Sequence, residues 1–115
     1  MTTNTNITNE GNINAPVSLC IPRVNINIKE PQVRKIFDEL KIGIIDRIDI
    51  VKKTTGRGDK YNRVFIHFKK WNNNENANTA YELLMNGKEI KIMYDEPWFW
   101  KASLKRLSTT TITTL

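Results

Sequence analysis

Residues 61–68 alternate in side-chain character along their whole length. A period of two is typical of a β-strand, because successive side chains of a strand point to opposite faces of the sheet. The apolar face, which we expect to enter the core, holds Val64, Ile66 and Phe68. The other face holds Arg63, Phe65 and His67. A cation, an aromatic ring and an imidazole on one surface suit stacking on unpaired bases and neutralising phosphates.

The remaining periodicities predict a β-α-β-β-α-β order. Further strands are expected at 17–21, where Pro22 ends the strand, and at 44–51 and 89–94. One helix begins at Pro31 and ends at Gly43, and its buried stripe is Val33, Ile36, Phe37 and Leu40. A second helix follows the caps of 72–74, and its stripe is Ala77, Ala80, Tyr81 and Leu84. This order predicts an α+β, ferredoxin-like fold: a four-stranded antiparallel sheet with two helices on one face. The face without helices is where we expect function.

The two ends of the chain differ in composition from its middle. Residues 1–16 are rich in Thr and Asn, and we expect a flexible tail there. Residues 17–101 form the predicted domain with an aromatic C-terminal extension, and 102–115 a basic and then Thr-rich tail. Because Thr and Ile favour extended chain, either tail is able to pair as an added strand with a partner.

Charge and cysteine content narrow the function classes. The formal net charge is +6, which favours acidic partners: nucleic acid first, then a membrane surface or an acidic protein. A basic protein without such a partner is the alternative. One Cys and one His cannot form a structural zinc site, so we expect no metal and no cofactor. A lone Cys, no membrane-length apolar run and no signal peptide predict an intracellular protein of the cytoplasm or nucleus.

Residues 17–94 resemble the RNA-recognition motif (RRM) family. The segment 19–24 falls where the family has its shorter signature, and 65–68 is similar to the second half of its longer one. The segments 43–51 and 55–57 are similar to its second strand and the loop after it. Together with an Asn-, Ile- and Lys-rich composition, the segment 97–101 resembles RRM-like proteins of large DNA viruses, which implies a place in a virus factory or virion.

The chain departs from the family pattern at the positions that stack on bases. These positions are Cys20, Arg63 and Phe65, of which only Phe65 is aromatic. Arg63 can stack its guanidinium plane, and His67 is a further flat group on the same face. Asn62 stands where the longer signature of the family has a glycine, and Arg23 stands where the shorter signature has an asparagine. The resemblance therefore implies weak, salt-sensitive and loosely selective binding of single-stranded RNA.

Two sets of residues are candidates for binding. The RNA-binding set comprises Arg63, Phe65, His67, Cys20, Arg23, Lys52, Lys53, Arg57, Lys60 and Lys91. Within it, Lys52 to Lys60 form a basic glycine loop suited to phosphate, and Cys20 is a small filler rather than a reactive thiol. The partner-binding set comprises Trp98, Phe99 and Trp100. For these aromatic residues packing ranks first, a protein partner second and base stacking third.

Three functions are compared. The first is an RRM-like module for single-stranded RNA. The second is a protein-interaction or structural module, for example of a virion, on an RRM-like fold that does not bind RNA. It binds a partner or a second copy through the aromatic extension and the tails. The third, a nuclease, is set aside, because Asp46, Asp49 and Asp95 are scattered and His67 has no evident nucleophile or carboxylate partner. We therefore expect no enzyme, and we expect no membrane among the partners.

Overall fold

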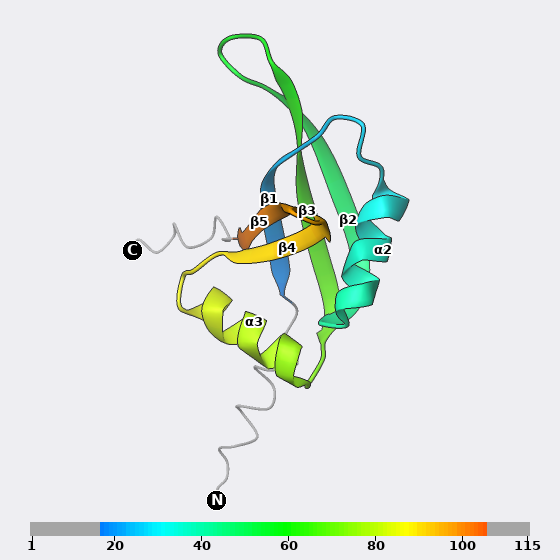
Figure 1. Ribbon diagram of the computed structural model, residues 1–115, viewed down its shortest axis with the longest axis vertical. Coiled ribbons are helices and arrows are strands. Elements are labelled where there is room, and N and C mark those ends of the chain that lie inside the picture. The colour runs from blue at the N-terminus through cyan, green and yellow to red at the C-terminus, as the bar shows by residue number, and fades with distance from the viewer. Residues whose placement is uncertain (1–16, 106–115) are drawn as a thin grey trace, which may run out of the picture.

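A computed structural model of the chain describes residues 17–105 (Figure 1). The flexible tail predicted for residues 1–16 and the part of the predicted Thr-rich C-terminal tail from residue 106 onward lie outside the described residues. The described elements are β1 (Ser18–Val24), α2 (Glu30–Leu40), β2 (Gly43–Thr54), β3 (Lys60–Trp71), α3 (Glu75–Met85), β4 (Ile90–Asp95) and β5 (Trp98–Leu104). The α+β class and all four predicted strands are confirmed, and a fifth strand follows them. None of these helices is long and apolar enough to cross a membrane.

The sheet has five antiparallel strands in the order β2-β3-β1-β5-β4, one more than predicted. The added strand β5 pairs with β1 on one side and with β4 on the other. It alternates, since Trp100 and Ala102 are buried while Lys101 is exposed. The aromatic extension is thus a strand of the sheet, and it continues past Lys101 to Leu104. In Figure 1 the β4–β5 hairpin lies crosswise to the long β2–β3 hairpin.

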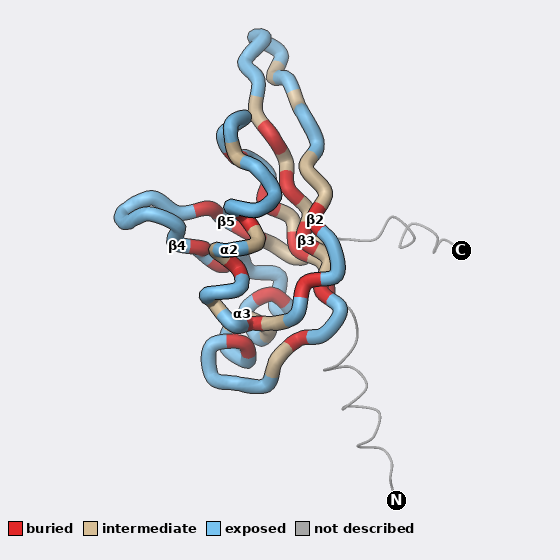
Figure 2. The backbone as a smooth tube through the Cα atoms, turned by 90° about the vertical axis from the view of Figure 1, so that its right-hand side faces the viewer, coloured by how far each residue is buried: buried red, intermediate tan, exposed pale blue. Residues whose placement is uncertain are grey.

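Both helices pack on the same face of the sheet. The predicted stripes are confirmed: Val33 and Phe37 of α2 and Ala77 and Leu84 of α3 are buried, and Ile36, Leu40, Ala80 and Tyr81 pack around them. They meet the apolar face of the central strands, made by Leu19, Ile21, Val64, Ile66 and Phe68. Figure 2 shows this alternation as buried and less buried segments along β3. The opposite sheet face therefore carries the other side chains of the same strands.

The predicted ends of β1 and α2 are wrong. Strand β1 runs through Pro22 to Val24 instead of ending at residue 21, because its pairing with β3 shifts between Ile21 and Val24. Proline is tolerated at such an irregularity, where its missing N–H breaks no regular ladder. Helix α2 ends at Leu40, and Lys41 takes the left-handed conformation there with φ 54°. Gly43, predicted to end this helix, is instead the first residue of β2.

The β2–β3 hairpin is longer than predicted and projects from the rest of the molecule (Figure 1). Its loop is only residues 55–59, so Lys52, Lys53 and Lys60 lie on strands rather than in a loop. The Thr55 hydroxyl accepts bonds from the backbone N–H groups of residues 57 and 59, at 3.2 and 3.1 Å. Gly58 has φ 96°, which a residue without Cβ adopts at little cost.

Candidate nucleic-acid interface

The sheet face away from the helices, here called the open face, gathers polar side chains around one aromatic ring. Phe65 lies at its centre on β3. The Cα register places Cys20 of β1 and Asp49 of β2 opposite Phe65. It also places Ser18 and Arg47 opposite His67, one step further along the strands. Five of the six residues are partly buried, and Arg47 is exposed. Within residues 17–105, no helix covers this face.

The Phe65 ring lies among cations. The Lys105 ammonium lies over the ring, 5.7 Å from its centroid. Arg63, two residues along the same strand, donates from Nε to the Pro22 carbonyl at 3.4 Å. The side chain of Arg63 therefore reaches toward β1 rather than standing out from the sheet. Two cations thus lie near a flat apolar surface, next to the Asp49 carboxylate on β2. A ring with cations near it is the combination that binds single-stranded nucleic acid.

Cys20 is a filler beside Phe65 rather than a reactive group. Partial burial raises the pKa of its thiol, and the neighbouring charges of Arg63 and Lys105 only partly offset this effect. Reactive thiols have a lowered pKa. The thiol of Cys20 therefore stays protonated at neutral pH, as a small side chain next to the ring.

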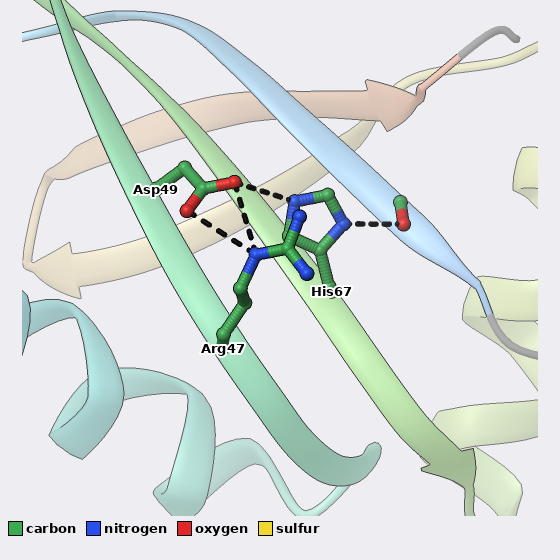
Figure 3. Close-up of polar contacts among 4 residues, drawn as sticks. Arg47, Asp49 and His67 are labelled. Carbon is green, nitrogen blue, oxygen red and sulfur yellow. Dashed lines mark hydrogen bonds and ion pairs between the residues drawn. The ribbon is translucent and has the colours of Figure 1, made fainter.

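His67 links β1, β3 and β2 through a chain of polar contacts (Figure 3). The Ser18 hydroxyl lies 2.8 Å from His67 Nδ1, and Asp49 Oδ2 lies 2.9 Å from His67 Nε2. Arg47 Nε contacts both carboxylate oxygens of Asp49, at 3.4 and 3.3 Å. The expectation that His67 has no hydroxyl or carboxylate partner is therefore wrong. Strand pairing brings together groups that are far apart in the sequence.

The charge of Asp49 fixes the direction of these hydrogen bonds. The hydrogen bond from His67, aided by Arg47, lowers the pKa of Asp49, so its carboxylate is ionised at neutral pH and only accepts. His67 Nε2 must then donate to Asp49, and in the neutral imidazole Nδ1 accepts from the Ser18 hydroxyl. Each member of the chain orients the next.

The order hydroxyl, imidazole, carboxylate is also the order used by activated nucleophiles. Acyl transfer further needs N–H donors aimed at a developing oxyanion. Ser18 lies on β1, which pairs with β3 on one side and β5 on the other, so its backbone is part of a regular sheet. The arrangement is therefore better suited to holding side chains in place than to acyl transfer.

Most of the predicted phosphate-binding residues lie on or near the long hairpin, and one of them, Lys91, lies on the edge strand at the other end of the sheet. Lys52, Lys53 and Lys60 line a cavity of about 340 Å³ at the hairpin, together with Ile26 and Asn62. Arg57 is almost fully exposed at the tip, 3.7 Å from the Asp59 carboxylate. Arg23 lies over the Tyr61 ring at 4.3 Å. Lys91 is on β4, the far edge strand, where its ammonium lies over the Phe99 ring at 4.8 Å.

The three partner-binding candidates divide between core and surface. Trp100 is only 5% exposed and stacks on Tyr94, with ring centroids 4.6 Å apart. Packing was the first-ranked expectation for these three residues, and Trp100 meets it because its side chain is in the core. Trp98 is 63% exposed and Phe99 37%, near the turn between β4 and β5. Neither tryptophan is in register with Phe65, so β5 does not restore a stacking position there.

Sequence reasoning missed four residues of the open face: Ser18, Arg47, Asp49 and Lys105. The outward direction of Arg47 and Asp49 was readable from the alternation of the second strand. Their link to His67 was not readable, because alternation gives the face but not the register. Comparison with protein-family models, curated proteins and solved structures found no match to this chain.

Proposed function

We propose that this chain is a nucleic-acid-binding module of ferredoxin-like, RRM-like type that binds single-stranded RNA weakly on the open face. The observation that carries the proposal is the Phe65 ring, placed on a helix-free sheet face with the Lys105 ammonium above it. A base stacks on this ring, and Lys105 moves from the ring to a phosphate.

The long hairpin holds the RNA backbone in this proposal. Lys52, Lys53 and Lys60 lie close enough together to line one cavity, and Arg57 extends beyond them. Contacts from such side chains to phosphates supply affinity without sequence information. We therefore expect binding that falls steeply with salt.

The test is fluorescence-anisotropy titration of a labelled single-stranded RNA pool at low and moderate salt. Loss of a stacked base costs about 1–3 kcal/mol, so we expect Phe65→Ala to weaken binding at least about fivefold. Phe99→Ala is the matched control, because Phe99 also lies under a lysine but on the remote hairpin. No binding at low salt, or equal losses in both variants, contradicts the proposal.

A second candidate is a protein-interaction module, and the end of the β4–β5 hairpin favours it. Met93, Trp98 and Phe99 are 51%, 63% and 37% exposed, and Met93 pairs with Phe99 across the hairpin. Exposed tryptophan is a frequent anchor at protein interfaces. Under this function the native protein does not bind RNA, and Trp98→Ala lowers the self-association that sedimentation detects. A native protein that stays monomeric at high concentration contradicts the self-association form.

A further inference from the structure

Arg47 stands at the exposed end of the hydrogen-bonded chain on the open face. The side chains of His67, Asp49 and Arg47 are 18%, 41% and 63% exposed, so the chain runs from half-buried to solvent-exposed groups. Within the described residues, the hydrogen bonds of the Arg47 side chain come from Nε, which donates to the Asp49 carboxylate. Among residues 17–105, its two terminal amino groups have no hydrogen-bond partner, and they form a fork of N–H donors at the outer end.

This fork lies within reach of a base on Phe65. Asp49 is the direct cross-strand partner of Phe65, and Arg47 is the partner of His67, two residues further along β3. Arg47 is thus a diagonal neighbour of Phe65, a relation that spans about 7–8 Å between Cα atoms and that long side chains cross. Figure 3 shows the guanidinium of Arg47 extending from β2 toward β3, the strand that carries His67.

The donor pattern of the fork matches the edge of guanine best. Guanine presents two acceptors, O6 and N7, on one edge, and arginine pairs with both. Adenine replaces O6 by an amino donor, which meets the donors of arginine unfavourably. Uracil has no pair of neighbouring acceptors, because its N3–H lies between its two carbonyl oxygens. In a single strand cytosine does present two neighbouring acceptors, O2 and N3, but a pyrimidine covers less of the Phe65 ring than a purine does, so guanine is the better match.

We propose that Arg47 recognises the O6/N7 edge of a guanine stacked on Phe65, with Asp49 and His67 as positioning residues for its guanidinium. The inference rests on the proposed RNA-binding function and adds base preference to it. It assigns a purpose to the hydrogen-bonded chain: Ser18 orients His67, His67 orients Asp49, and Asp49 holds Nε so that the terminal fork faces outward.

The test uses labelled uridine-rich oligoribonucleotides that differ at one central base. The central base is guanosine, inosine, 7-deazaguanosine or adenosine. Inosine keeps O6 and N7, so we expect it to bind like guanosine. Loss of N7 or replacement of O6 should weaken binding about fivefold or more, in line with the discrimination of a bidentate pair. Equal affinity for all four oligonucleotides overturns the inference, as does a loss confined to inosine.

Variants separate recognition from charge. Arg47→Lys keeps the positive charge and removes the fork, so the guanosine-to-adenosine ratio should fall to about one while adenosine binding is retained. Asp49→Asn should also lower this ratio, although it removes a negative charge from the RNA-binding face. Arg34→Lys is the matched control, because Arg34 pairs with Glu30 at 3.0 Å on α2, which packs on the other sheet face. An unchanged ratio in Arg47→Lys overturns the inference.

The same titrations distinguish the two proposals. Binding that depends on Phe65 but shows no base preference overturns only the role of Arg47. Absence of RNA binding by the native protein overturns both. Circular dichroism of each variant tests whether the substitution leaves the fold intact.

Discussion

At the residue scale, Asp49 couples proton uptake to stability. The hydrogen bond from His67 lowers the pKa of Asp49 from its usual value of 3.8. A carboxyl group whose pKa is lowered by folding stabilises the folded state at pH above 3.8, and this contribution is lost as the pH falls through the lowered value. We expect His67→Leu, which removes the N–H donor, to raise the pKa of Asp49 toward 3.8, as measured by NMR titration of the carboxyl carbon.

The stability of Asp49→Asn provides the complementary measurement. Because the native carboxylate loses its advantage once protonated, the variant should be less stable than native protein at pH 7 and should approach it in acid. Urea unfolding at both pH values measures the difference. A destabilisation that is the same at pH 7 and in acid would mean that ionisation of Asp49 contributes nothing.

Gly43 is the residue where β2 has no room for a side chain. A Cβ built at this position would lie 2.5 Å from the Lys70 carbonyl oxygen and 2.8 Å from a ring carbon of Phe68. We expect Gly43→Ala to lower the free energy of unfolding by about 1–3 kcal/mol, the usual cost of overpacking. Gly56→Ala, in the hairpin loop with nothing within 4 Å, should change it by less than about 0.5 kcal/mol. Equal effects in urea unfolding would refute the steric argument.

At the scale of elements, β5 carries two tryptophans on one face with different roles. Trp100 is buried against Tyr94, whereas Trp98 is mostly exposed near the end of the same strand. Truncating a buried tryptophan costs about 3–5 kcal/mol, so Trp100→Ala should leave the domain close to unfolding. Trp98→Ala should cost less than about 0.5 kcal/mol. Thermal unfolding of both variants measures the difference. Similar unfolding midpoints for Trp100→Ala and Trp98→Ala would contradict the assignment of Trp100 to the core.

Local periodicity predicts most elements of this fold, because each helix and strand buries one stripe of its own sequence. The stripes of α2 and α3 and the alternation of β3 are confirmed in this way. The fifth strand was not predicted, since the dense aromatic residues of 98–100 indicate packing without indicating a partner strand. The predicted strand β1 ended too early, at Pro22. Sequence alone does not reveal that the ladder between β1 and β3 is irregular there and tolerates a proline.

The open face was predicted less completely than the core, for a physical reason. Side-chain direction follows from the sequence of each strand alone, so Phe65 and His67 could be placed on a common face. Which residues meet across strands depends on register, which is a property of the assembled sheet. The Ser18–His67–Asp49 chain spans three strands and is therefore visible only in the structure.

At the scale of the whole molecule, the position of charge should matter more than its total. The formal net charge is +6, and Arg57→Gln and Arg34→Gln each remove one positive charge. Both arginines have an acidic neighbour, at 3.7 and 3.0 Å, but Arg57 is at the tip of the long hairpin and Arg34 is on α2. For single strands, each phosphate contact adds about 0.7 to the steepness of log K against log salt.

We therefore expect Arg57→Gln to lower the steepness of this salt dependence by about 0.7 and to weaken binding to all RNA sequences alike. Arg34→Gln should leave the slope unchanged, because its guanidinium lies away from the proposed RNA path. Anisotropy titrations across a salt series measure both slopes. If the two variants lose the same steepness, overall charge governs binding and the hairpin has no special part in it. If only Arg57→Gln changes the slope, the hairpin contacts the RNA backbone.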